Sequence, residues 1–154
     1  MNFTRNLFGH PVRCHAQRGV AAVEFALIAI LFFTLLLGIM EFGRWLFLLN
    51  GANEATRLGA RLGVVCSVEA PGNLTLIKAR MSAMTGGGIP AANMVLDYVP
   101  ANCDASNCQT VTARIVGATF NPVSPFFGGN FPIPQFPTSL PREYMTSAGN
   151  PVCP

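Results

Sequence analysis

The clearest pattern in the sequence is an apolar run near the N-terminus. From Phe25 to Met40 no residue is charged, and only Thr34 is polar. As a helix that rises about 1.5 Å per residue, the interval from Glu24 to Glu41 measures about 25 Å, close to the roughly 30 Å of a bilayer's hydrocarbon core. A core helix this apolar on every side would need more protein around it than the remaining chain provides. The pattern therefore predicts one membrane-spanning helix.

The helical pattern continues beyond the apolar run to about Val65. One side of this part carries only small residues, a stripe that lets two helix backbones approach closely: Ala52, Ala55, Thr56, Gly59, Ala60 and Gly63. The stripe fits equally well against the protein's own sheet and against the helix of a neighbouring subunit. Glu41 and Arg44 lie one helical turn apart at the outer membrane boundary, where Trp45 suits an anchor in the interface.

The remaining residues predict a short helix and several short strands. Pro71 and Gly72 break the long helix, and apolar periodicity predicts a short amphipathic helix over residues 73–84. Alternation predicts strands over residues 94–99 and 109–117, joined by a turn between two cysteines. Residues 122–141 are rich in Pro and Phe, which predicts a long loop packed on the sheet or on a partner, and residues 140–146 predict an edge strand.

This order of elements predicts an α+β fold. A long N-terminal transmembrane helix continues into a small module with a short helix and an antiparallel sheet. The expected divisions are residues 1–19, 20–65 and 66–154.

Charge is unevenly placed along the chain. Only 11% of the residues are charged, against roughly 25% in soluble domains, and 51% are hydrophobic. The net charge of +3 comes from Arg5, Arg13 and Arg18, while the residues after Gly19 balance. Without a broad basic surface, nucleic-acid binding is not expected. The positive-inside rule predicts a cytoplasmic N-terminus and a translocated C-terminal module. A secretory signal fits poorly because no small-x-small cleavage site ends the run.

A carboxylate stands at the start of the apolar helix. Glu24 lies five residues after Gly19, and an unpaired carboxylate is costly in a membrane. It can lie at headgroup level near the positive end of the helix. Alternatively, the chain is cut after Gly19, and the new ammonium group of Val20 lies near this carboxylate in the same or a neighbouring subunit.

Three segments together carry a family resemblance. Residues 18–27 (RGVAAVEFAL), 38–44 (GIMEFGR) and 53–61 (NEATRLGAR) resemble the TadE/TadF-like family, the minor pseudopilins of bacterial tight-adherence (Flp, type IVb) pili. The resemblance is specific over residues 18–65 and weak beyond them. It implies that a prepilin peptidase at the inner membrane removes residues 1–19 between Gly19 and Val20, with Glu24 as the assembly carboxylate.

The same resemblance implies a location and partners. The mature chain would be a single-pass inner-membrane protein with its module in the periplasm, and it could be incorporated in the pilus. Its partners would be the major Flp pilin, other minor pseudopilins, the inner-membrane assembly platform and the prepilin peptidase. In this setting we expect the stripe from Ala52 to Gly63 to pack on a neighbouring subunit.

The cysteines fit an oxidising compartment. Of five cysteines, Cys14 lies in the expected leader, which leaves an even set of four. An even set in a periplasmic module predicts two disulfides. Of the three possible pairings we favour Cys103 with Cys108, closing the hairpin, and Cys66 with Cys153. A zinc site is the alternative, but only one loosely spaced cysteine pair is present.

No catalytic pattern is found in the sequence. Both histidines, His10 and His15, lie in the expected leader, and the acidic residues of the module are scattered. We expect no enzyme activity, metal or cofactor. The expected function is assembly or initiation of a tight-adherence pilus. The alternative is a membrane-anchored periplasmic binding or adhesive module, with the Pro/Phe-rich loop as its contact surface.

Overall fold

The structure is a computed structural model that describes residues 17–124 and 127–153. Most of the expected leader, including Cys14 and both histidines, therefore lies outside the described residues. The chain divides into two units, residues 1–39 and 40–154. The described part of the first unit is helical throughout, and every strand that the structure describes lies in the second unit.

The long helix α1 covers Gln17–Val65. It ends at the predicted residue, but it begins three residues before Val20, inside the expected leader. It contains no proline, and its glycines adopt helical backbone angles. Its last turn is extended by a hydrogen bond from the Cys66 N–H to the Leu62 carbonyl, 2.8 Å long. Pro71 and Gly72 follow, and Gly72 takes a φ of 94°, a conformation that glycine adopts without strain.

The second helix, α2, covers Asn73–Met84, the range that apolar periodicity predicted. Two glycines after it, Gly86 and Gly87, have positive φ and turn the chain back. The buried Thr85 side chain accepts a hydrogen bond from the Ile89 N–H at 3.1 Å, which fixes this turn. A short 3-10 helix, Ala91–Asn93, then leads into the sheet.

The main sheet has three antiparallel strands in the order β1-β2-β5. Strand β1 covers Met94–Val99, β2 covers Thr110–Ile115 and β5 covers Thr138–Pro141. Alternate residues of β2 are buried, so one face of the sheet is covered, and the residues between them are half-buried on the other face. Tyr98 and Leu140 lie opposite Val111 on its two sides.

The edge strand begins two residues earlier than the pattern predicted and ends at Pro141. Its register places Leu140 beside Val111 on the covered face. Pro141 has no N–H to donate, which is tolerated because β5 lies at the edge of the sheet. Beyond it, the Arg142 N–H donates to the Gln109 carbonyl, 2.8 Å away.

A two-stranded hairpin that the sequence did not predict joins a segment just before the Pro/Phe-rich region to a segment inside it. Strand β3, Thr119–Phe120, pairs with β4, Phe131–Pro132. The Ile133 N–H extends the pairing by donating to the Ala118 carbonyl at 2.9 Å. Strands of two residues give little alternation to detect, which explains why the pattern showed only a loop.

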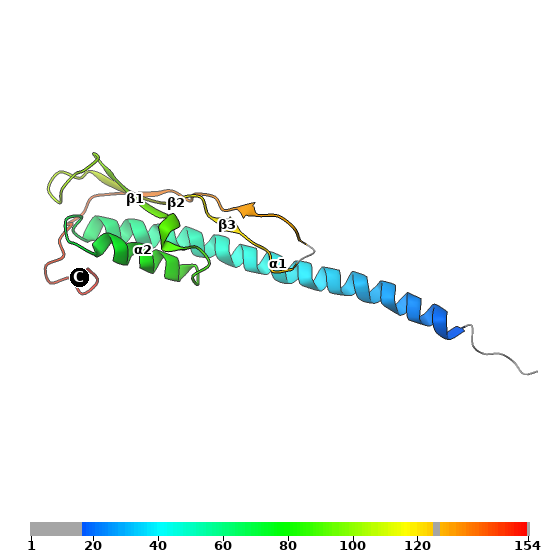
Figure 1. The fold of residues 1–154 in the computed structure, drawn as a ribbon. Helices are drawn as coiled ribbons and strands as arrows, with labels where there is room; N and C mark the ends of the chain where they lie inside the picture. Colours follow the sequence, from blue (N-terminus) through cyan, green and yellow to red (C-terminus); the bar gives the residue numbers. More distant parts are fainter. Residues whose placement is uncertain (1–16, 125–126, 154) are drawn as a thin grey trace, which may run out of the picture. The chain divides into compact units, whose positions relative to one another are not determined.

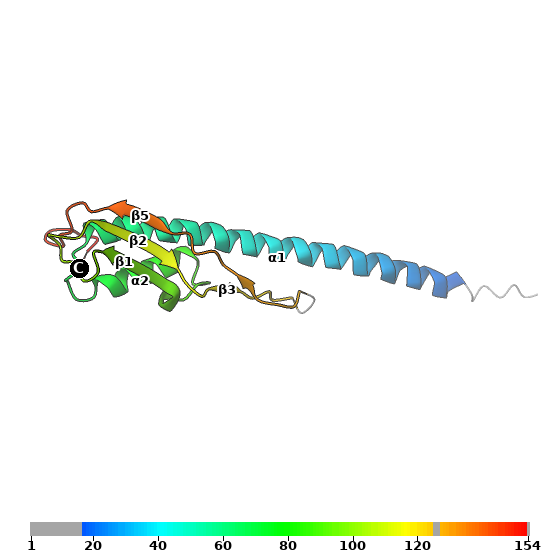
Figure 2. The same ribbon diagram turned by 90° about the horizontal axis from the view of Figure 1, so that it is seen from above.

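The core of the second unit lies between its helices and the covered face of the main sheet. Figures 1 and 2 show α2 beside the C-terminal part of α1, with the sheet across both. Side chains from the three layers form one buried cluster, which includes Ala55 on α1, Met81 on α2 and Ile115 on β2. A smaller cluster around Val64 and Met145 extends the core toward the Cys103–Cys108 turn.

Candidate functional site

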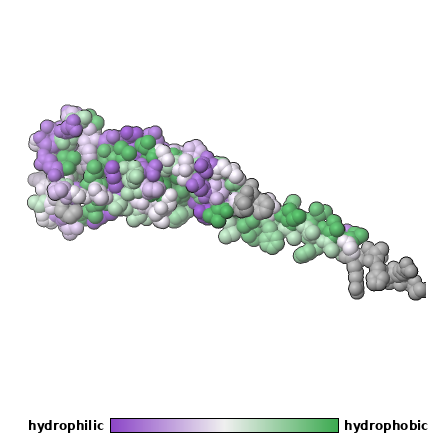
Figure 3. Space-filling model, viewed as in Figure 1, coloured by the Kyte–Doolittle hydropathy of each residue, from purple (hydrophilic) through white to green (hydrophobic). Residues whose placement is uncertain are grey.

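The side chains in the apolar part of α1 are not buried by the residues that the structure describes. No side chain from Phe25 to Met40 is buried, and exposure reaches 74% at Phe25. In Figure 3 this part of the helix shows an almost continuous hydrophobic surface. Thr34 satisfies its hydroxyl group within the helix by donating to the Ile30 carbonyl at 2.7 Å, as polar side chains in lipid do. One long apolar N-terminal helix of this kind is compatible with a single-pass membrane protein.

The expected cleavage position lies in the first described turn of α1. Gly19 and Val20 are exposed, and a Cβ added at Gly19 would meet no atom within 4 Å. Glu24 is exposed one turn later and has no hydrogen bond or ion pair within the described residues. No described residue therefore occupies this carboxylate.

The small-residue stripe does not face a neighbouring subunit. Ala52, Ala55, Thr56 and Ala60 have no exposed surface, because they lie under α2 and the main sheet of the same chain. The Thr56 hydroxyl group lies 3.2 Å from that of Thr138 on β5. The expectation that this stripe packs on another subunit is therefore wrong. A stripe of small residues permits close approach without selecting the partner, and here the module itself supplies it.

The glycines of the stripe show how close this approach is. A Cβ at Gly59 would lie 2.4 Å from the Met81 sulfur, and one at Gly63 would lie 2.7 Å from Cγ1 of Val111. Gly51 differs from these two because the nearest atom belongs to the backbone. An added Cβ would lie 2.9 Å from the Met84 carbonyl oxygen. Gly51 was not part of the predicted stripe, although it directly precedes Ala52.

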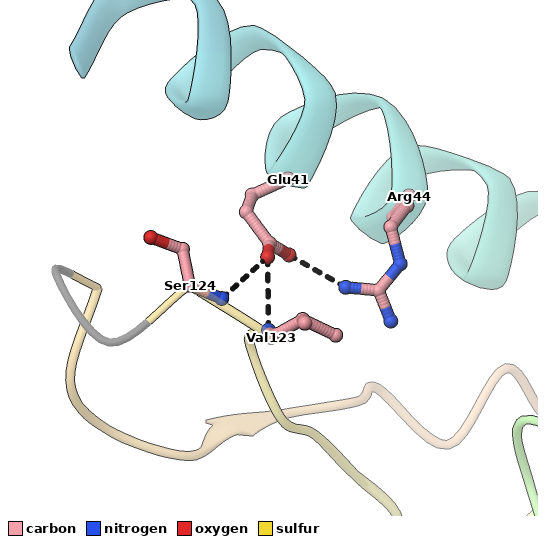
Figure 4. A network of polar contacts seen from close by, with 4 residues as sticks. All are labelled: Glu41, Arg44, Val123 and Ser124. Carbon is pink, nitrogen blue, oxygen red and sulfur yellow. Dashed lines mark hydrogen bonds and ion pairs between the residues drawn. The ribbon is translucent and has the colours of Figure 1, made fainter. Parts of the chain in front are cut away.

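A carboxylate directly after the apolar run holds the β3–β4 hairpin. Oε1 of Glu41 accepts hydrogen bonds from the backbone N–H groups of Val123 and Ser124, each 2.8 Å long. Its other oxygen accepts one from the Arg44 guanidinium group at 2.7 Å. Figure 4 shows all three bonds converging on this carboxylate. The Glu41–Arg44 spacing was visible in the sequence, but the backbone donors come from a segment with no recognisable pattern.

Aromatic rings surround this contact. Trp45 lies between Phe42 and Phe131, with ring centroids 5.9 and 6.4 Å away. The Arg44 guanidinium carbon lies 5.4 Å from the centre of the Phe120 ring, within the range of a cation–π interaction. The hairpin is thus fixed to α1 by both polar and aromatic contacts.

The four cysteines of the module form the two disulfides that the sequence analysis favoured. Cys66 is bonded to Cys153 and Cys103 to Cys108. The first joins the end of α1 to the C-terminal segment, and the second closes the turn between β1 and β2.

The turn between β1 and β2 is held by Asp104. Its side chain accepts hydrogen bonds from the hydroxyl and backbone N–H groups of Ser106 and from the Asn107 N–H. The Ser106 side chain is the largest of several influences that lower the pKa of Asp104, and the backbone donors and Arg142 add to it. Arg142 also donates to the Ala105 and Ser106 carbonyls. The Asp104 carboxylate therefore stabilises the turn between β1 and β2.

The acidic side chains that the structure describes do not converge on a metal site. Within residues 17–124 and 127–153, no group of three His, Cys, Asp or Glu side chains could hold a metal ion. Asp97 instead pairs with Arg114 across β1 and β2, at 2.5 Å.

Comparison with known proteins finds a family match for most of α1. Residues 19–61 match the model of a family described as TadE-like protein, which confirms the resemblance over this segment. The match begins at Gly19 and covers less than half of the chain. No curated protein and no solved structure matches the chain.

Proposed function

We propose that this chain, whose first helix is TadE-like, is a minor pseudopilin that acts in assembly or initiation of a tight-adherence pilus. The observation that carries the proposal is the family match over residues 19–61, which starts at the expected cleavage position and includes the whole exposed apolar run. The match supports association with the Tad pilus machinery, and the structure adds that the helix enters a disulfide-bonded module.

The exposed apolar part of α1 is the assembly element in this proposal. A helix apolar on every side needs lipid before assembly and other helices after it. Since the module buries the stripe from Ala52 to Gly63, contacts with the major Flp pilin and other pseudopilins would involve α1 before Met40. The inner-membrane assembly platform would contact the same part of α1, before Met40.

Processing after Gly19 would prepare this helix. Glycine costs a helix about 1 kcal/mol relative to alanine. The segment around Gly19 can therefore open readily for a prepilin peptidase. Val20 and Glu24 are four residues apart and so lie on the same side of the helix. The new ammonium group of Val20 would lie near the Glu24 carboxylate of its own or a neighbouring subunit.

The proposed orientation places the N-terminus in the cytoplasm and the module in the periplasm. The basic residues before Gly19 favour this orientation, and an oxidising compartment suits the two disulfides. The proposed role is structural and not enzymatic, and it involves no cofactor.

The mature N-terminus tests this proposal. The protein is extracted from membranes of cells with and without a prepilin peptidase, and its intact mass is measured. We expect loss of residues 1–19 only where the peptidase is present. A full-length chain in both would contradict pseudopilin processing and favour a membrane-anchored binding module.

A further inference from the structure

We infer that the β3–β4 hairpin is a second membrane-contacting element, which rests in the headgroup layer beside α1. The contact surface, here called the interfacial patch, consists of Phe42 and Trp45 on α1 with Val123 and Phe131 on the hairpin. The inference rests on the proposed membrane insertion of α1. It adds a lipid contact made by the module.

The hairpin is held at one level of the helix. The Val123 and Ser124 N–H groups both bind Glu41, which is the first residue after the apolar run. Strand β4 is fixed there too, because the Phe131 ring contacts Trp45 one turn further along α1. The hairpin therefore lies at the position along the helix where the apolar run ends.

The length of the apolar run sets the depth of this position. Phe25 to Met40 measures about 24 Å as a helix, shorter than a hydrocarbon core of about 30 Å. A short span draws its flanking residues toward the acyl–headgroup boundary. A carboxylate at that depth needs donors, and Glu41 has three hydrogen bonds with only 12% of its side chain exposed. The contacts of Glu41 thus suit a weakly polar environment.

The chemistry of the patch favours lipid over water. Val123 is 76% exposed, and Phe42 and Phe131 keep about half of their surfaces exposed. Aromatic side chains at the end of an apolar helix are typical of the membrane interface. Residues 119–133 carry no charge, and Glu41 and Arg44 neutralise each other. The patch therefore fits a zwitterionic lipid surface and needs no anionic lipid.

The single tryptophan of the chain makes a direct test possible. Trp45→Phe removes the native signal, and Val123→Trp then adds one tryptophan at an exposed position of the hairpin. The full-length protein is placed in phosphatidylcholine vesicles whose lipids carry bromine either near the headgroup or near the chain end. Two matched variants in the same Trp45→Phe background place the tryptophan elsewhere. One is Phe32→Trp, within the apolar run, and the other is Tyr144→Trp, at a position that is 85% exposed.

We expect the tryptophan at position 123 to be quenched most by shallow bromine, at a depth of about 5–10 Å into the headgroup boundary. Its accessibility to acrylamide should fall below that of the tryptophan at position 144. The inference is overturned if position 123 is open to acrylamide and unquenched by bromine while position 32 is quenched. Shielding from both quenchers would also overturn it, since a protein surface then covers the hairpin. Loss of quenching at position 32 would instead contradict the proposed membrane insertion.

The polar contact is tested with a matched pair of variants. Glu41→Ala removes the acceptor for two hairpin N–H groups, and we expect it to reduce bromine quenching at position 123 but not at position 32. Glu54→Ala is the control. Like Glu41 with Arg44, Glu54 forms an ion pair with the arginine three residues later, Arg57, at 3.1 Å on the same helix. Equal effects of the two variants would contradict a role for Glu41 in placing the hairpin.

Discussion

At Gly51 the two helices come so close that a methyl group has no room. An added Cβ would lie 2.9 Å from the Met84 carbonyl oxygen and 3.2 Å from the Thr85 Cα. Both are backbone atoms, so neither can rotate away as the Met81 side chain can at Gly59. Gly43, on the same helix, has no atom within 4 Å of the equivalent position.

We predict that Gly51→Ala lowers the free energy of unfolding by about 1–3 kcal/mol, because α1 and α2 must move apart. Gly43→Ala should be neutral or stabilising by up to about 1 kcal/mol, as alanine favours a helix. Thermal unfolding in detergent, followed by circular dichroism, measures both. Equal loss in the two variants would show that the distance to Met84 does not matter.

The turn at Asp104 should respond to pH. Its pKa is lower in the folded chain than in the unfolded one, because several groups donate to the carboxylate. The stabilisation is therefore present above the ordinary Asp pKa of about 4 and is lost as the pH falls through the folded value. We predict that the melting temperatures of wild type and Asp104→Asn differ at pH 7 and converge on acidification. A difference that stays constant with pH would contradict this.

At the scale of elements, two disulfides restrain the second unit differently. Cys66–Cys153 spans 87 positions and ties the end of α1 to the C-terminal segment. Cys103–Cys108 spans five and closes a turn that Asp104 already organises. The entropy of closing a loop in the unfolded chain rises with the logarithm of its length, which here favours the long one by about 2.5 kcal/mol.

We predict that replacing Cys66 and Cys153 with alanine costs about 2–5 kcal/mol, and that replacing Cys103 and Cys108 costs clearly less. Denaturant unfolding of the two double variants in detergent, under non-reducing conditions, compares them directly. A larger loss for the short loop would mean that the turn, and not the link to the C-terminal segment, limits the stability of the module.

For the whole molecule, the apolar run and the residues before it determine the proposed role. Gly19 has open space around it, so the fold accepts alanine there. Glu24 has no partner within the described residues, so its loss removes no contact among them. Effects of substitution at either position therefore report on processing and assembly.

We predict that Gly19→Ala slows removal of residues 1–19, whereas Glu24→Ala leaves removal largely intact and reduces incorporation into pili. Comparing processed chain in membranes with chain in sheared fibres separates the two effects. Glu54→Ala, at an exposed position of α1, is the control. Normal incorporation of the Glu24→Ala protein would rule out the proposed pairing with the new N-terminus.

The sequence by itself determined the elements whose signal is local. Uninterrupted apolar residues predicted the membrane part of α1, and apolar periodicity predicted the exact bounds of α2. Alternation predicted the exact bounds of β1, and it predicted β2 as residues 109–117, which is three residues too long. Residues 18–27, 38–44 and 53–61 together also indicated the resemblance to TadE-like proteins, which the match over residues 19–61 confirms.

Only the tertiary structure decided which surfaces meet. The structure shows that the small-residue stripe packs against the chain's own module and that β5 covers Thr138–Pro141. It also shows that the Val123 N–H donates a hydrogen bond to Glu41. The physical reason is that small side chains, short strands and backbone N–H groups carry no local signature of their partner. Those partners are selected by the packing of segments far apart in the sequence, such as α1 and the hairpin.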